Sequence, residues 1–85
     1  MKITVKYFAL LREAVGVGEE VIEVPETVAT VGELRTYLSN LDAVHKDAFA
    51  GVKRIRSAVN ATMVKDSAPI AQNDEVAFFP PVTGG

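Results

Sequence analysis

Residues 30–42, which read TVGELRTYLSNLD, predict the main helix of this chain and with it a two-layer fold. Thr30 and Glu33 have the spacing of a capping box, in which each side chain bonds a free backbone N–H group at the start of the helix. Asn40 and Asp42 mark its predicted end. Apolar residues recur every three or four positions and form one stripe along this helix: Val31, Leu34, Leu38 and Leu41. A helix with one apolar stripe needs a second layer to cover it, and the flanking residues supply a sheet.

The sequence before this helix predicts two strands. Residues 2–8 alternate between polar and apolar side chains, and Phe8 is the apolar exception on the polar face. The face that points toward the core consists of Ile3, Val5 and Tyr7. Residues 9–15 form a short helix, and Gly16 suits its C-terminal cap. Residues 19–24 form the second strand, and the short connection favours an antiparallel pair.

The sequence after the main helix predicts one further helical turn and three further strands. The turn covers Val44–Gly51, and the strands cover residues 55–59, 62–64 and 75–79. Asn60-Ala61 lies where the first two of these strands connect. A strand pair, a crossing helix and a parallel return strand predict an α+β fold. We expect a mixed sheet of four to five strands packed on one main helix, with a short second helix or turn.

Composition limits the classes of function. The chain has 85 residues, which predicts one domain with little room for an internal active-site cavity. Its formal net charge of −2 argues against nucleic-acid binding, which needs a basic surface. The lack of cysteine excludes disulfides, thiolate metal sites and cysteine nucleophiles. We expect neither a signal peptide nor a membrane span, and therefore a cytoplasmic protein.

The ionisable residues offer few candidates for a site. His45, the one histidine, is predicted to lie on the surface and not to bind a metal, since metal sites need several ligands. The basic segment Lys53-Arg54-Ile55-Arg56 leaves two interpretations open: a charged edge strand, or a docking patch for an acidic partner or an anionic substrate. An acidic run favours a solvated strand face over paired catalytic carboxylates, which would need a cleft. It consists of Glu19, Glu20, Glu23 and Glu26.

The C-terminal stretch, residues 80–85, is a feature that a folded domain does not need. Pro80 and Pro81 have no backbone N–H group and cannot continue a central strand, and they hold Phe79 extended. The two terminal glycines have no Cβ atom, so they can lie against another backbone or pass along a narrow channel. We therefore divide the chain into a domain of residues 1–79 and a flexible C-terminal tail of residues 80–85 that ends in Gly-Gly.

The last twelve residues carry a family resemblance. Residues 74–85 read DEVAFFPPVTGG and look like the end of the small, sulfur-carrying subunits of molybdopterin synthase, which are ubiquitin-like β-grasp proteins. Other matching segments are Tyr7-Phe8-Ala9, Leu11-Arg12-Glu13 with Gly16, and Ala58-Val59-Asn60. The resemblance covers the whole chain, and its specific part is the C-terminal segment.

The resemblance implies a sulfur-transfer cycle at the carboxylate of Gly85. An E1-like adenylating enzyme would use ATP to form a glycyl adenylate there. A sulfur donor such as a cysteine desulfurase or a rhodanese-type protein would then convert it to a thiocarboxylate, 1-thioglycine. The sulfur would pass to cyclic pyranopterin monophosphate in the large subunit of a heterotetrameric molybdopterin synthase. The tail residues that insert there would be Pro80, Pro81, Val82, Thr83 and Gly84. The chain alone should hold no permanent cofactor or metal and should have no turnover.

Two phenylalanines are predicted to form the surface that meets a partner. If the first and last strands are parallel neighbours, Phe8 and Phe79 lie at the same ends of those strands and on the face away from the helix. Exposed aromatic pairs of this kind mark protein interfaces.

Three other functions remain open on the sequence. The first is sulfur delivery for thiamin or another thiolated product. The second is a ubiquitin-like modifier that is joined to lysines through Gly85. The third is an interaction domain with an idle tail.

Overall fold

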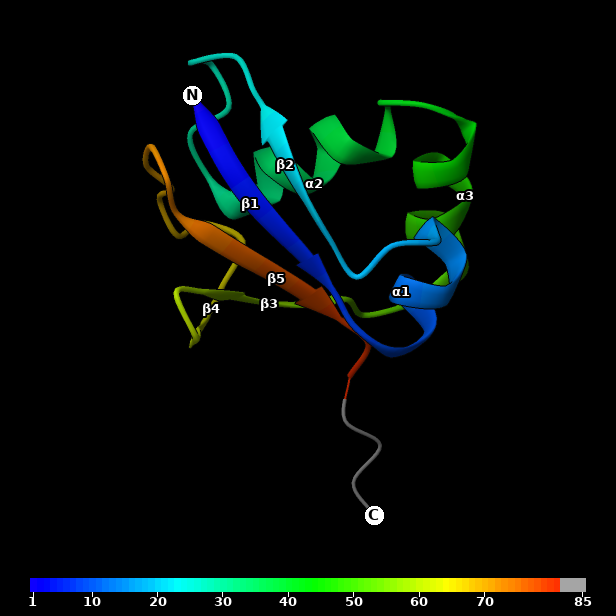
Figure 1. The fold of residues 1–85 in the computed structure, drawn as a ribbon. Coiled ribbons are helices and arrows are strands. Elements are labelled where there is room, and N and C mark those ends of the chain that lie inside the picture. Colours follow the sequence, from blue (N-terminus) through cyan, green and yellow to red (C-terminus); the bar gives the residue numbers. More distant parts are fainter. Residues whose placement is uncertain (82–85) are drawn as a thin grey trace.

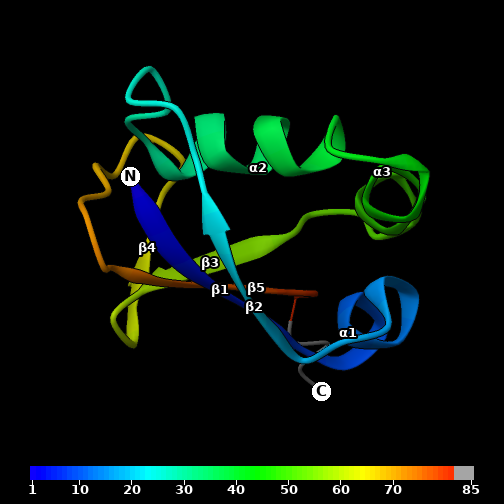
Figure 2. The ribbon, with the colours of Figure 1, turned by 45° about the horizontal axis from the view of Figure 1, so that its top comes forward.

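The computed structural model describes residues 1–81, which form five strands and three helices. Figure 1 shows the strands in one twisted sheet, and Figure 2 shows α2 lying across one face of that sheet. The predicted α+β fold is confirmed, and its arrangement is that of a ubiquitin-like β-grasp. In chain order the elements are β1 (Lys2–Tyr7), α1 (Ala9–Val15), β2 (Glu19–Glu23), α2 (Val31–Ser39), α3 (Ala43–Gly51), β3 (Arg56–Val59), β4 (Thr62–Val64) and β5 (Glu75–Phe79).

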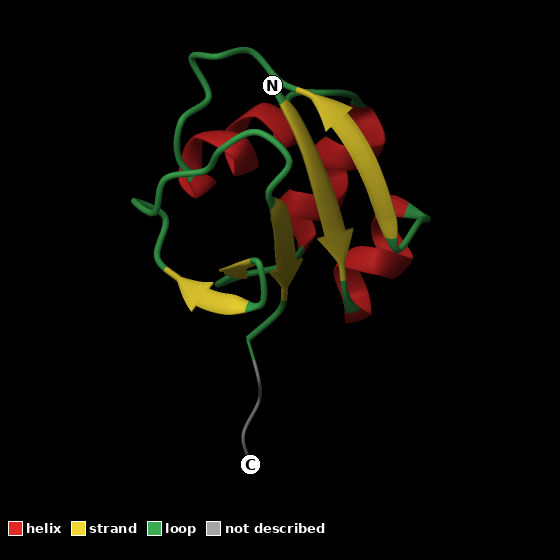
Figure 3. Ribbon diagram, turned by 60° about the vertical axis from the view of Figure 1, so that its left-hand side comes forward, coloured by secondary structure: helices red, strands yellow, loops and turns green. Residues whose placement is uncertain are grey.

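The strands follow the order β2-β1-β5-β3-β4 across the sheet. β1 pairs antiparallel with β2 and parallel with β5, as the sequence predicted. β3 pairs antiparallel with both β5 and β4. The last strand therefore lies in the centre of the sheet, although it is the last element of the chain. In residues 1–81 the helices lie on one side of the sheet, and the opposite face carries none (Figure 3).

The core lies between α2 and the inner faces of β1 and β5. The inward residues of both strands are fully buried, as alternation predicted: Ile3, Val5, Tyr7, Val76 and Phe78. α2 covers them with Val31, Leu34 and Leu38, each of which has an exposed fraction of 0%. Full burial of one such side chain stabilises the fold by about 1.5–3 kcal/mol. The apolar stripe and the alternating strands therefore account for most of the packing that joins the two layers.

Local capping fixes both ends of α2. The Thr30 hydroxyl accepts a hydrogen bond from the Glu33 backbone N–H at 3.2 Å, and the Thr30 N–H donates to Glu33 Oε1 at 3.1 Å. The predicted capping box is therefore confirmed. The helix ends at Ser39 with Asn40 as its cap. Leu41 consequently lies beyond the helix and is 41% exposed, so its predicted place on the buried stripe is wrong.

The basic segment is not an edge strand, which corrects one of the two interpretations. Only Arg56 belongs to a strand, and that strand, β3, lies between β5 and β4. The three-residue β4 occupies the edge instead, because the turn at Asn60 and Ala61 folds it back along β3. Residues 53–55 form the connection that leads from α3 into β3.

Within residues 1–81, no helix combines the length and the apolar character that crossing a membrane requires.

Candidate functional site

The root of the tail is held on both sides by the sheet. Phe78 pairs with Tyr7 of β1, and Phe79 pairs with Arg56 of β3. The Phe8 N–H donates to the Phe78 carbonyl oxygen at 3.2 Å, which extends the contact one residue past the end of β1. The direction in which the chain leaves the domain is therefore set by a central strand. Four of the predicted tail residues, Val82–Gly85, lie outside the described residues.

The two predicted phenylalanines lie on the face of the sheet away from α2. Phe8 caps α1 in an extended conformation and is 47% exposed. Phe79 is half-buried and alternates with the inward Phe78. The structure thus places both residues beside the root of the tail, while their role in binding stays a prediction.

Met63 extends this apolar surface, and the sequence analysis missed it. In the sheet register Met63 is opposite Ala58, and Ala58 is opposite Ala77, two residues before Phe79 on the same face. Met63 is 53% exposed. The signal was available in the turn at residues 60–61, because a two-residue turn fixes which side chains of the returning strand face outward. We define Phe8, Met63, Ala77 and Phe79 as the apolar surface.

His45 is buried, which corrects the prediction that it lies on the surface. Its exposed fraction is 6%. Its Nε2 lies 2.6 Å from Glu20 Oε2, and its Nδ1 lies 2.8 Å from Asp42 Oδ1. The Tyr7 hydroxyl donates to the same Glu20 oxygen at 2.6 Å. Glu20 therefore belongs to a partly buried hydrogen-bond network and not, as predicted, to a simply solvated acidic face. We call Tyr7, Glu20, Asp42 and His45 the histidine network.

The geometry of this network suits a histidine that carries a proton on each ring nitrogen. An ionised carboxylate only accepts hydrogen bonds, so each ring nitrogen of His45 donates when the carboxylate that it faces is ionised. Burial lowers the pKa of His45, but the hydrogen bonds to Glu20 and Asp42 outweigh it and raise the pKa above its ordinary value. Hydrogen bonds from His45 lower the pKa of Asp42, and burial followed by the Glu20 contact raises the pKa of Tyr7.

The histidine network attaches α3 to the sheet. Asp42 caps α3 by accepting from the His45 N–H at 2.8 Å, so the cap and the ring contact come from one side chain. Further along α3, Phe49 packs edge-on against Tyr7 and Phe78, with ring centroids 6.2 and 5.5 Å apart. These contacts give the network a structural role. No group of three or more side chains in residues 1–81 is arranged to hold a metal ion.

Comparison with known proteins places the chain in a family. The sequence model of the ThiS family matches residues 5–85. The chain belongs to the ThiS family. It is 41% identical to the molybdopterin synthase sulfur carrier subunit of Escherichia coli over 86 residues, which cover 98% of this chain and 99% of that protein. It is 36% identical to the corresponding subunit of Haemophilus influenzae, with the same coverage. The predicted resemblance to these ThiS-family subunits is confirmed.

Solved structures of similar fold include members with other names. SAMP1 from Haloferax volcanii has a TM-score of 0.75 and 29% identity, and the match covers 100% of both chains. The fold is also found in a complex of subunits 1 and 2 of the molybdopterin-converting factor from Helicobacter pylori, with a TM-score of 0.65, 24% identity and full coverage of both chains. The second likeness shows the fold alone.

Proposed function

We propose that this chain is the sulfur-carrying small subunit of a molybdopterin synthase and that the carboxylate of Gly85 carries the sulfur. The observation that carries this proposal is the 41% identity to the sulfur carrier subunit of E. coli over nearly the whole length of both proteins. The central position of β5 supports it, because a partner can then grip a rigid domain while it receives the tail. We retain the division into a domain of residues 1–79 and a tail of residues 80–85.

The chemistry follows from the C-terminal carboxylate. A carboxylate is a poor electrophile, and transfer of AMP from ATP by an E1-like adenylating enzyme gives Gly85 a good leaving group. The outer sulfur of a persulfide on a cysteine desulfurase or rhodanese-type donor then attacks the acyl adenylate and displaces AMP. A thiol cleaves the resulting acyl disulfide, which releases the thiocarboxylate and leaves a disulfide on the donor. A side chain at Gly84 or Gly85 would obstruct the acyl carbon, and glycine removes that obstacle. The chain needs no cysteine to carry reactive sulfur, and it works in the cytoplasm, where its partners use ATP.

Sulfur delivery takes place in the large subunit. The tail from Pro80 to Gly84 would enter that subunit, so that the thiocarboxylate reaches cyclic pyranopterin monophosphate, and two such transfers complete the dithiolene of molybdopterin. Ordering each tail residue costs about 1–2 kcal/mol of backbone entropy. Pro80 and Pro81 reduce this cost because their φ angles are already restricted in the free chain. The synthase would be a heterotetramer with one carrier at each end of a large-subunit dimer.

The apolar surface would bind the large subunit beside the tail. Aromatic and methionine side chains are enriched at protein interfaces, and Phe8 and Met63 are already about half exposed. We expect Phe79→Ala to weaken binding to the purified large subunit by tenfold or more, a loss typical of an interface hot spot. Calorimetric titration measures the affinity, and thermal unfolding measures stability. An equal loss of both would contradict the interface role.

The intact mass of the protein tests the carrier chemistry. The chain is incubated with ATP, a sulfur source and the host's adenylating enzyme. We expect a gain of about 16 Da, one oxygen replaced by sulfur, that is confined to the C-terminal peptide. A variant that lacks Gly85 is the matched control and should show no gain. An unchanged mass, with the enzyme active on another carrier, would overturn the proposal.

A second candidate function is protein modification through Gly85. It is favoured by the similarity to a Haloferax volcanii protein that is named small archaeal modifier protein 1, with a TM-score of 0.75 and 28% identity. Incubation of the tagged chain with cell extract and ATP, followed by peptide mass spectrometry, separates the two functions. Isopeptide adducts on lysines would favour the modifier, whereas a thiocarboxylate without adducts favours the carrier.

A further inference from the structure

Charge is distributed unevenly along this chain. Residues 13–33 contain six acidic side chains and no basic one, whereas residues 48–56 contain three basic side chains and no acidic one. The acidic block includes β2, at one edge of the sheet, and the basic block leads from α3 into β3 on the other side of the central strand. Acidic side chains therefore gather toward one edge of the sheet and basic side chains on the other side of β5, although the formal net charge is only −2.

A groove lies next to the basic block. It lies between α2 and α3, has a volume of about 560 Å³, and is also lined by the segment that leads into β3. Its charged lining consists of Arg35, Lys46, Arg54 and Asp66. The groove is open to solvent, and Phe49, Val52 and Ile55 are apolar residues of its lining.

Two cations of this groove have no carboxylate partner within the described residues 1–81. Arg35 and Asp66 neutralise each other through a paired contact, in which Arg35 Nη1 donates to Asp66 Oδ1 at 2.9 Å. No ion pair formed within residues 1–81 involves Lys46 or Arg54. Both side chains are exposed. The groove thus keeps an uncompensated positive charge.

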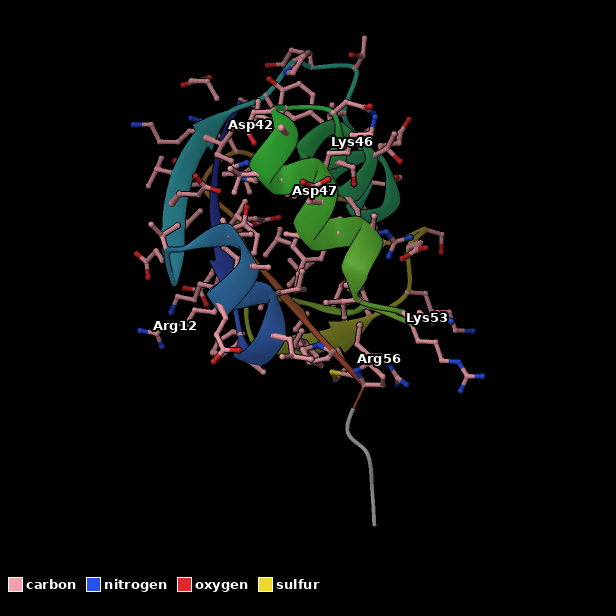
Figure 4. The ribbon with its side chains drawn as sticks, turned by 90° about the vertical axis from the view of Figure 1, so that its right-hand side faces the viewer. Arg12, Asp42, Lys46, Asp47, Lys53 and Arg56 are labelled. Carbon is pink, nitrogen blue, oxygen red and sulfur yellow. The ribbon has the colours of Figure 1, made fainter. Side chains whose placement is uncertain are left out.

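The same charge continues to the root of the tail. Arg56 pairs with Phe79 in the sheet register and lies beside the end of β5 in Figure 4, and Lys53 lies in the lower half of the molecule in that view. Asp42 lies toward the opposite end of α3 in that view, and Asp47, in the middle of the helix, does not line the groove. Any protein that holds the tail therefore lies within reach of these cations.

The backbone at Arg54 is strained. Its φ angle is 56°, in the left-handed region that costs a residue with a side chain about 1–2 kcal/mol. Glycine would adopt this φ angle without strain. The local backbone conformation therefore does not explain why an arginine is found at this position. Strain of this kind gathers at functional sites.

We propose that this groove and the cations beside the tail root bind a carboxylate-rich segment of the large subunit that receives the tail. The inference rests on the proposed function, and it adds the chemistry of the partner's surface. Acidic side chains of the partner would lie opposite Lys46, Lys53, Arg54 and Arg56, so that the carrier is oriented before its tail enters. The partner is the large subunit because the 41% identical relative from E. coli is named as a subunit of molybdopterin synthase.

Association kinetics at two salt concentrations test this surface. The groove variant combines Lys46→Glu with Arg54→Glu. Its matched control combines Lys2→Glu with Lys65→Glu, which changes the net charge equally at two exposed lysines that do not line the groove. We expect the groove variant to associate with the purified large subunit about tenfold more slowly at low salt, the lower end of the range for electrostatic steering. The control should change by less than about twofold, and high salt should remove the difference.

Three results would overturn the proposal. Equal slowing in both variants would mean that only net charge acts. Unchanged association of the groove variant would mean that the groove is not used. Slower thiocarboxylation of the groove variant, with unchanged binding to the large subunit, would assign the surface to the adenylating enzyme. The gain in mass described above is measured on the same variants, so that a failed docking surface is distinguished from a failed carrier.

Carbodiimide coupling locates the contact directly, because this reagent joins lysine amines to nearby carboxylates. We expect cross-links from Lys46 and Lys53 to acidic residues of the large subunit. Cross-links only from Lys2 and Lys65 would contradict the proposal. Arg54→Gly is a further variant that removes the charge and the strain together. It should fold with unchanged or higher thermal stability and yet bind more weakly, and unchanged binding would count against the groove.

Discussion

The charged side chains at the two ends of α3 differ in burial and in ionic pairing. At its N-terminal end His45 is buried, and each ring nitrogen faces a carboxylate oxygen. Beyond its C-terminal end Lys53, Arg54 and Arg56 are exposed, and they form no ion pair within residues 1–81. Removing one partner from a buried pair leaves an uncompensated charge, whereas an exposed charge contributes little to folding. The first region therefore stabilises the domain, and the second is available to a partner.

The largest expected effect is at His45. Its removal in His45→Ala leaves Glu20 and Asp42 facing each other without the cation that joins α3 to β2. We expect the free energy of unfolding to fall by about 2 kcal/mol, less than for a fully enclosed pair because Glu20 and Asp42 are partly exposed. Urea denaturation at pH 7 measures it. Lys46→Ala, one residue along the helix, is the control and should change stability by less than about 0.5 kcal/mol.

The pH dependence of stability is a second test of the contrast between the histidine network and the exposed cations. Because the pKa of His45 is raised in the fold, its contribution is fully present below the unfolded value of about 6.5 and is lost as the pH rises through the folded pKa. Urea titrations between pH 6 and 9 should show stability falling in the native protein and a flatter profile in His45→Ala. Asp42, whose pKa is lowered, loses its contribution only at acidic pH, and Tyr7 acts only above about pH 10. Identical profiles would contradict the charged histidine.

Tyr7→Phe should have a smaller effect. The ring keeps its edge contacts with Phe49 and His45, and only the hydroxyl that donates to Glu20 is lost. We expect a loss of about 1 kcal/mol, the usual contribution of one hydrogen bond. A double-mutant cycle with Glu20→Gln isolates the pair energy. Additive effects of the two substitutions would show that the hydroxyl and the carboxylate act independently.

The smallest effect is expected at the other end of α3. Lys53→Ala combined with Arg56→Ala should change the free energy of unfolding by less than about 0.5 kcal/mol, because neither side chain has an ionic partner in the described chain. The same urea titration measures it. A loss above about 1 kcal/mol would mean that these cations stabilise the domain after all, and the contrast between the two regions would disappear.

Local patterns predicted the fold because their partners are close in sequence. Thr30 and Glu33 are three residues apart, and the alternation in β1 needs no knowledge of the neighbouring strand. The histidine network was missed because Glu20 and His45 are 25 residues apart, and nothing near either residue indicates the other. Leu41 was wrongly predicted to lie on the apolar stripe because helix ends are hard to predict from sequence. The cap residue Asn40 ends the helix before the next apolar position is reached.

The site was predictable only in part. The alternation of β5 and the parallel pairing put Phe79 near Phe8, and the turn at residues 60–61 could have placed Met63 beside them. The groove between α2 and α3 needed the packing of three separate segments. The sequence could indicate that the basic segment is charged. Whether its charges are paired depends on which carboxylates the fold brings near, and that is a property of the tertiary structure.

The central position of β5 also has a mechanical consequence. If a partner pulls on the chain beyond Phe79, the force acts along β5, while the hydrogen bonds of β5 to antiparallel β3 run across it. Such a load shears the bonds to β1 and β3 together and does not peel them one at a time, and a central strand has two sets of these bonds where an edge strand has one. The domain can therefore act as an anchor that stays folded while its end is drawn into, and released from, another protein.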